Sequence, residues 1–100
     1  MATKQEKSDD NVIFVGGKPF MNYMTGIITQ FNKEDTKEIK IISRGKFISK
    51  AVDIAEATKK KFLKDSNIII KEIKTNSEEF ETKEGKKVTV STMDIVLRKN

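Results

Sequence analysis

The side chains in this 100-residue sequence that are best suited to chemistry are basic residues next to glycines. Arg44 and Lys46 flank Gly45, and a predicted helix begins at this point. A helix N-terminus presents free backbone N–H groups and the positive end of the helix dipole, and both favour phosphate. The planar Arg44 guanidinium can also bind a phosphate through two hydrogen bonds. The spacing therefore indicates an anion-binding loop.

A second basic loop lies at residues 15–19, between a predicted strand and a predicted helix. It contains Gly16, Gly17 and Lys18, which are followed by Pro19. If the strands that precede the two loops are parallel, both loops lie at the same edge of the sheet and face one ligand. The segment is not a P-loop, because a P-loop has Ser or Thr after the Lys. A tight turn that simply uses its glycines is the alternative interpretation.

A third basic group, formed by Lys83, Lys86 and Lys87, lies at the tip of a predicted hairpin. A two-stranded arm with a basic tip can reach along a duplex into the minor groove. Four acidic residues share this arm and give it a mixed charge: Glu78, Glu79, Glu81 and Glu84. A charged, soluble turn is therefore the alternative interpretation of the tip.

The composition excludes most familiar active sites. The chain has no Cys and no His, so it has no disulfides, no thiolate or imidazole metal ligands, no thiol nucleophile and no imidazole base. Catalysis would need carboxylates or a Ser–Lys pair, and no spacing singles out Ser43, Ser49 or Lys50. We therefore expect a non-enzymatic protein with no cofactor, no metal and no small-molecule substrate.

The sequence also carries no signal for a membrane or for export. No apolar run approaches the roughly 18 residues of a membrane span, and the first ten residues, MATKQEKSDD, lack the apolar core of a signal peptide. We expect a cytoplasmic protein with a flexible polar tail at residues 1–10 and one domain at residues 11–100.

The positive charge is concentrated in one part of the chain. The formal net charge is +5, and residues 36–64 hold nine basic against three acidic residues. In a helix that begins near Lys46, Lys50 shares the Lys46 face, at about 100° per residue. Three further lysines fall near that face: Lys60, Lys61 and Lys64. A polyanionic partner such as nucleic acid would suit this concentration, and a solvated helix surface is the alternative.

Hydrophobic periodicity predicts an α+β fold with the element order β-α-β-α-β-β. Strands are expected at residues 11–16, 38–43, 67–75 and 90–99, and helices at residues 19–31 and 46–63. One sheet with both helices on one face makes a two-layer sandwich, and the last two strands form a hairpin whose polar outer half extends as an arm. In the last strand the apolar positions change parity near Ser91-Thr92, which indicates a bulge or a change of the covered face.

The aromatic side chains mostly fit core or interface positions and do not alternate with basic residues as base-stacking surfaces do. Tyr23 and Phe47 are the candidate exceptions. Phe62 is unusual because it lies between Lys61 and Leu63 in a run of lysines. Burial in the core and an exposed protein contact are both open interpretations for Phe62.

Four segments in collinear order make the chain resemble the archaeal Alba family of chromatin proteins. The segments are NVIFVGGKPFMNY at 11–23, RGKFISKAVD at 44–53, KKFL at 60–63 and VSTMDIVLRK at 90–99. The resemblance covers residues 11–100. It implies a fold like that of the C-terminal domain of translation initiation factor three, a homodimer, and binding to double-stranded DNA and RNA with little sequence preference. It leaves two roles open: coating and compacting the chromosome, or RNA stabilisation and processing.

The resemblance also implies roles for individual residues. The family's GKKP loop reads GGKP here, so Lys18 matches the second Lys and is a candidate for modification, while Gly17 replaces the first. The family's RGR loop reads Arg44-Gly45-Lys46, which carries the nucleic-acid role to Arg44 and Lys46. Phe62 matches an aromatic residue that mediates contact between neighbouring dimers. The complete set of expected nucleic-acid-binding residues is Lys18, Arg44, Lys46, Lys50, Lys83, Lys86 and Lys87.

Overall fold

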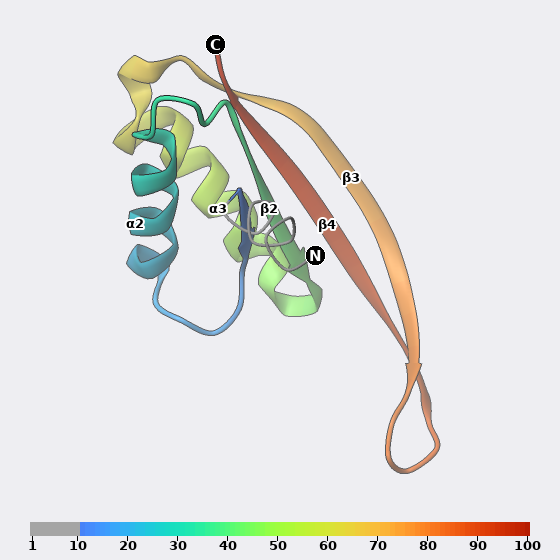
Figure 1. Ribbon diagram of the computed structural model, residues 1–100. Coiled ribbons are helices and arrows are strands. Elements are labelled where there is room, and N and C mark those ends of the chain that lie inside the picture. The colour runs from blue at the N-terminus through green and yellow to red at the C-terminus, as the bar shows by residue number, and fades with distance from the viewer. Residues whose placement is uncertain (1–10) are drawn as a thin grey trace, which may run out of the picture.

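A four-stranded sheet with two helices on one of its faces forms the domain (Figure 1). The computed structural model describes residues 11–100, and the expected tail at residues 1–10 lies outside them. The strands follow the spatial order β1-β2-β4-β3, and their bounds are β1 Val12–Phe14, β2 Glu38–Arg44, β3 Ile68–Glu81 and β4 Lys87–Lys99. The helices are α2 Phe20–Phe31 and α3 Ile48–Ala57. The predicted α+β class, element order and extended hairpin are confirmed.

The strand pairing fixes which ends of the strands lie together. β1 runs parallel to β2, with Val12 opposite Lys40 and Phe14 opposite Ile42. β4 is antiparallel to both β2 and β3. The connections that leave β1 and β2 therefore emerge at the same edge of the sheet, as the sequence predicted.

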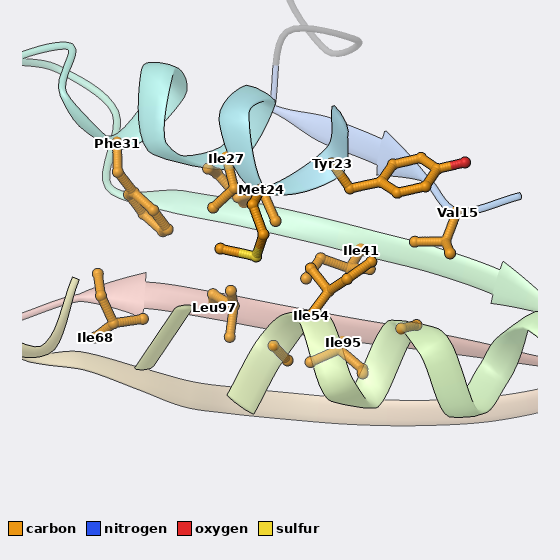
Figure 2. Close-up of a cluster of buried hydrophobic side chains, with 13 residues drawn as sticks. Val15, Tyr23, Met24, Ile27, Phe31, Ile41, Ile54, Ile68, Ile95 and Leu97 are labelled. Carbon is orange, nitrogen blue, oxygen red and sulfur yellow. The ribbon is translucent and has the colours of Figure 1, made fainter. Parts of the chain in front are cut away.

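The core lies between the helices and the sheet. Met24 and Ile27 of α2 are fully buried, because they recur at the spacing that places side chains on one helical face. Figure 2 shows these side chains pointing from α2 toward the sheet. Odd-numbered apolar residues of the strands and one residue of α3 meet them there: Ile39, Ile41, Ile95, Leu97 and Ile54. Burying each such side chain contributes about 1.5–3 kcal/mol, so this layer stabilises the platform from which the loops emerge.

The second predicted helix, at residues 46–63, consists of three pieces. A 3-10 turn at Gly45–Phe47 leads into α3, and a π-helical turn follows at Thr58–Phe62. Gly45 adopts a left-handed conformation with φ of +57°, which glycine accepts without strain. In the last turn the Leu63 N–H donates to the Thr58 carbonyl oxygen, five residues earlier, at 3.0 Å. The helix thus widens as it passes the buried Thr58.

The β3–β4 hairpin projects beyond the body as an arm (Figure 1). Its strands pair from Ile68 opposite Lys99 out to Glu81 opposite Lys87. The register shifts between Ile70 and Glu72, so the irregularity lies in β3, and the bulge interpretation near Ser91-Thr92 is wrong. The β4 pairing runs unbroken there. The alternative interpretation fits the structure, because half-burial of Val88 and Val90 gives way to burial of Ile95 and Leu97.

Candidate nucleic-acid interface

The two basic loops lie side by side at one edge of the sheet. The Val15 N–H donates to the Ile42 carbonyl oxygen at 2.9 Å and extends the parallel pairing to the ends of β1 and β2. The chain then turns into residues 16–19 on one side and into Gly45–Phe47 on the other. Figure 1 shows the connection into α2 and the start of α3 at the same lower end of the body. The expected convergence of the two loops is therefore present.

Lys50 of α3 reaches across to the first of these loops. Its Nζ donates to the carbonyl oxygens of Gly16, at 2.9 Å, and of Lys18. The same ammonium lies 5.2 Å from the centroid of the Tyr23 ring, a favourable cation–π distance. The structure brings Lys50 and Lys18 together, and the Lys50 charge faces backbone carbonyls of the loop.

Tyr23 of α2 holds the same loop through its backbone N–H groups. Its hydroxyl oxygen accepts hydrogen bonds from the Gly16 N–H at 2.8 Å and the Lys18 N–H at 3.1 Å. Figure 2 shows the ring extending from α2 toward Val15. Tyr23 is buried, so the expectation that it could stack on a base is wrong. The signal in the sequence was a hydroxyl on the apolar face of a helix, because a buried tyrosine hydroxyl usually finds a partner.

Lys18 and Lys46 are the exposed ammonium groups of this edge. Neither takes part in an ion pair within residues 11–100. Lys46 lies 5.5 Å from the centroid of the Phe47 ring. A Cβ atom at Gly17 would lie more than 4 Å from every described heavy atom outside Gly17 and its two chain neighbours. The loop therefore has room for a side chain at the position where the family resemblance expects a lysine.

Arg44 leaves β2 on the sheet face opposite the helices. Ser43, its neighbour in the strand, is buried, and successive strand residues point to opposite faces. The Arg44 guanidinium forms an ion pair with Glu78 of the arm at 3.0 Å and lies 5.9 Å from the centroid of the Phe80 ring. Both charged side chains are more than half exposed, at 54% and 57%, so the pair contributes at most about 1 kcal/mol. A phosphate can therefore compete with Glu78 for Arg44.

The three lysines of the arm lie apart from the loops. Lys83, Lys86 and Lys87 are exposed around a turn in which Gly85 has a φ of +83°. Arg44 pairs opposite Thr92, so the tip lies about seven residues, or roughly 23 Å of strand, beyond it. The structure thus brings together Lys18, Arg44, Lys46 and Lys50 and leaves the arm lysines as a separate group.

Phe62 lies at the end of the π-helical turn, at the opposite end of α3 from Lys46. Its side chain is 37% exposed, and the Lys61 Nζ lies 6.0 Å from the ring centroid. It is absent from the buried core cluster. Of the two interpretations, the structure favours a surface position for Phe62, away from both basic loops.

The sheet face opposite the helices carries exposed apolar side chains. Phe14 of β1 is 66% exposed, and Phe80 of the arm is also exposed. A shallow hollow on this face is bounded by residues of all four strands: Phe14, Ile42, Ser43, Arg44, Asn76, Glu78, Thr92 and Asp94. No described helix covers this face (Figure 1).

Glu38 begins β2 at the end of the sheet far from the loops. Lys71 Nζ donates to its carboxylate at 2.7 Å, and this hydrogen bond lowers the pKa of Glu38, with a smaller contribution from the charge of Arg98. The contact joins β2 to the bulged part of β3. It supports the sheet and contributes no group to the loop edge.

The described residues form neither a cluster of metal-ligating side chains nor a membrane-spanning helix. Within residues 11–100, no group of three or more His, Cys, Asp or Glu is placed to hold a metal ion. In the same part of the chain, no helix combines the length and apolar character of a membrane span.

Sequence comparison relates the chain to known proteins over most of its length. The Alba family model matches residues 11–77. The DNA/RNA-binding protein Alba of Picrophilus torridus is 50% identical over 90 residues, which make up 90% of this chain and 97% of that protein. The protein of the same name from Methanothrix thermoacetophila is 45% identical over 92 residues, covering 92% of this chain and 99% of that protein.

Solved structures agree with the sequence comparison. Alba from Thermoplasma volcanium superimposes with a TM-score of 0.79 at 44% identity, covering 89% of this chain and all of that chain. ALBA1 from Trypanosoma brucei gives a TM-score of 0.69 at 20% identity, covering 90% of this chain and 69% of that chain. At that identity the second likeness concerns the fold alone.

Proposed function

The chain belongs to the Alba family of DNA/RNA-binding proteins, and we propose that it is a non-enzymatic chromatin protein that binds double-stranded DNA as a homodimer. The observation that carries the proposal is the convergence of two basic loops at one edge of the sheet, where Lys18 and Lys46 are exposed and Arg44 holds only an exposed ion pair. These groups suit the phosphates of a duplex.

Binding in this proposal is sequence-tolerant. Lys18, Arg44 and Lys46 contact phosphate oxygens, which position a protein on a duplex but carry no base sequence. Tyr23 of α2 is buried and is not available to stack on a base. The protein would coat and compact the chromosome, and its place in the cell would be the nucleoid in the cytoplasm.

The homodimer is proposed to form through the apolar part of the sheet face that the helices leave uncovered. Arg44 is the last residue of β2 and would lie at the rim of that contact, open to the duplex. The exposed Phe14 on this face supports the proposal, because burying an aromatic side chain is a strong driving force for association. Two protomers would then present two arms to one duplex, and Lys83, Lys86 and Lys87 would lie along its minor grooves.

Two further residue roles belong to the same proposal. The exposed Phe62, far from the loops, would contact a neighbouring dimer on the duplex. Lys18 would be the lysine whose modification lowers affinity, since acetylation removes the charge of an exposed phosphate contact.

The salt dependence of duplex affinity tests this function. Three basic groups per protomer neutralise about six phosphates per dimer, so the logarithm of the association constant should fall with the logarithm of salt concentration with a slope of about −5. The slope should be the same for duplexes of unrelated sequence. A slope near zero would contradict electrostatic coating of the duplex.

A role with RNA is the second candidate. The relatives from Picrophilus torridus and Methanothrix thermoacetophila are both described as DNA/RNA-binding, and an A-form duplex offers phosphates to the same loops. The protein would then act in RNA stabilisation or as a subunit of an RNA-processing complex. Parallel gel shifts with DNA and RNA duplexes of matched sequence, together with sequencing of nucleic acid recovered from cells, separate the two roles.

A further inference from the structure

We infer that Tyr23 and Lys50 are positioning residues, which hold the backbone of residues 16–18 in the shape that presents Lys18 to a phosphate. Lys50 then serves nucleic-acid binding through the loop and makes no direct phosphate contact. The assignment rests on the proposed function and changes the role expected for Lys50 from its charge alone.

The hydrogen bonds of the loop carry the inference. Its two outer N–H groups, of Gly16 and Lys18, donate to one atom, the Tyr23 hydroxyl oxygen. Its two outer carbonyl oxygens, of the same residues, accept from one atom, the Lys50 Nζ. Two side chains from two helices thus satisfy four backbone groups of a three-residue loop, and we call this arrangement the latch.

The loop needs such a latch because of its sequence. Gly16 and Gly17 stand in succession and have the largest backbone freedom of any residues, so ordering them costs more conformational entropy than ordering other residues. A loop that is ordered before binding does not incur that cost in the complex, which raises affinity. Tyr23 is buried in the core, so the latch ties the loop to the most rigid part of the domain.

The surroundings of Lys50 argue against direct phosphate contact. Its ammonium has two carbonyl acceptors and lies over the Tyr23 ring at 5.2 Å, and its side chain is half-buried. Moving it to a phosphate would break both hydrogen bonds and free the carbonyls of the loop. Lys46, in contrast, is exposed and donates to no backbone carbonyl among residues 11–100.

The test compares three variants of the full chain. Tyr23→Phe removes the hydroxyl and keeps the ring, Lys50→Met removes the ammonium and keeps most of the stem, and Lys46→Met is the matched control that removes an exposed ammonium. Two quantities are measured: the backbone ¹⁵N relaxation of Gly16 and Gly17 in the free protein, and the salt slope of duplex affinity. Thermal unfolding confirms that each variant is folded.

The latch predicts different results for the three variants. Tyr23→Phe and Lys50→Met should each make the loop amides mobile on the nanosecond timescale and weaken binding about fivefold, with little change in the salt slope, since no phosphate contact is removed. Lys46→Met should leave the loop amides rigid and make the slope shallower by about 2, because each dimer loses two phosphate contacts.

A double-mutant comparison tests whether Tyr23 affects duplex affinity through Lys18. In a Lys18→Met background, Tyr23→Phe should cause no further loss of affinity, because the latch acts by placing Lys18. A merely structural role of the tyrosine would weaken binding equally in both backgrounds.

Failure of the latch and failure of the proposed function would give different results. Loop amides that stay rigid in Tyr23→Phe, or a Lys50→Met slope that falls as much as that of Lys46→Met, would overturn the latch while leaving duplex binding intact. A parent protein that binds no duplex at low salt would instead contradict the proposed function, and the positioning role would fall with it.

Discussion

The loop edge of the body and the hairpin arm both present lysines, but they differ in charge and in support. The loop edge carries Lys18, Arg44, Lys46 and Lys50, which lie on two connections and on the adjoining ends of β2 and α3, next to a packed core. The outer arm, residues 76–90, holds four glutamates against three lysines and adds no residue to the buried core. Affinity should therefore come mainly from the loop edge, and the arm should extend the contact along the duplex.

The two regions meet at one contact. The Glu78 carboxylate of the arm forms an ion pair with the Arg44 guanidinium at 3.0 Å, so it lies where a phosphate would bind. Through this contact, the negative charge of the arm should lower the affinity of the loop edge for phosphate. The following variants act on the two regions separately and on the contact between them.

Arg44→Ala should have the largest effect, because in the proposed complex it removes a bidentate phosphate contact from each protomer of the dimer. We expect duplex affinity to fall about 30-fold, and equally for unrelated sequences. Fluorescence anisotropy titrations with several duplexes at one salt concentration measure this loss. A loss confined to one sequence would indicate base readout at the loop edge.

Gly17→Lys should strengthen the loop edge. A Cβ atom at this position meets no described atom within 4 Å beyond its chain neighbours, and the residue does not have a positive φ, so the new side chain causes no strain. In the proposed homodimer the substitution adds two charges, which should raise affinity about 10-fold at low salt and steepen the salt slope by about 2. Gly17→Ala is the control, and an equal gain in that variant would show that backbone rigidity, not charge, is responsible.

Glu78→Gln should show how much the contact between the arm and Arg44 weakens duplex binding. The substitution removes the carboxylate that competes with phosphate for Arg44, so affinity should rise about threefold. Glu84→Gln, near the tip, removes the same charge without touching Arg44 and serves as the matched control. If both variants gain equally, the effect is due to the overall charge of the arm.

Lys86→Ala should have the smallest effect. The lysine lies at the tip among glutamates, and we expect affinity to fall by no more than about twofold at physiological salt. Competition binding against the parent protein resolves a change of this size. A loss greater than that of Arg44→Ala would mean that the arm contributes more to duplex affinity than the loop edge does.

Local sequence patterns were enough to predict the platform of the site. The apolar stripe that includes Met24 and Ile27, and the β-branched runs of the strands, specify elements whose parallel start puts both loops at one edge. Helix periodicity also gave the span of residues 46–63, but it does not encode the π-helical turn at Thr58–Phe62, which begins at the buried Thr58.

The contacts that decide the chemistry were not readable from the sequence. The latch joins Tyr23 of one helix and Lys50 of the other to a loop, and such tertiary hydrogen bonds leave no periodic signal. The Arg44–Glu78 pair depends on the register of the arm, which a bulge between Ile70 and Glu72 shifts. The parity change in β4 was compatible with a bulge or with a change of the covered face. The second interpretation fits, because β4 leaves the body of the domain there, and the bulge lies in the neighbouring strand β3.

The salt slope of duplex affinity, measured for the parent protein and for the triple variant Lys18→Ala/Arg44→Ala/Lys46→Ala, decides whether the loop edge binds the duplex. Binding through the loop edge predicts a slope of about −5 for the parent and a slope close to zero for the variant, because the variant lacks the three proposed phosphate contacts of each protomer. A variant whose slope stays near −5 would contradict binding through the loop edge, since the arm or another surface would then carry the binding.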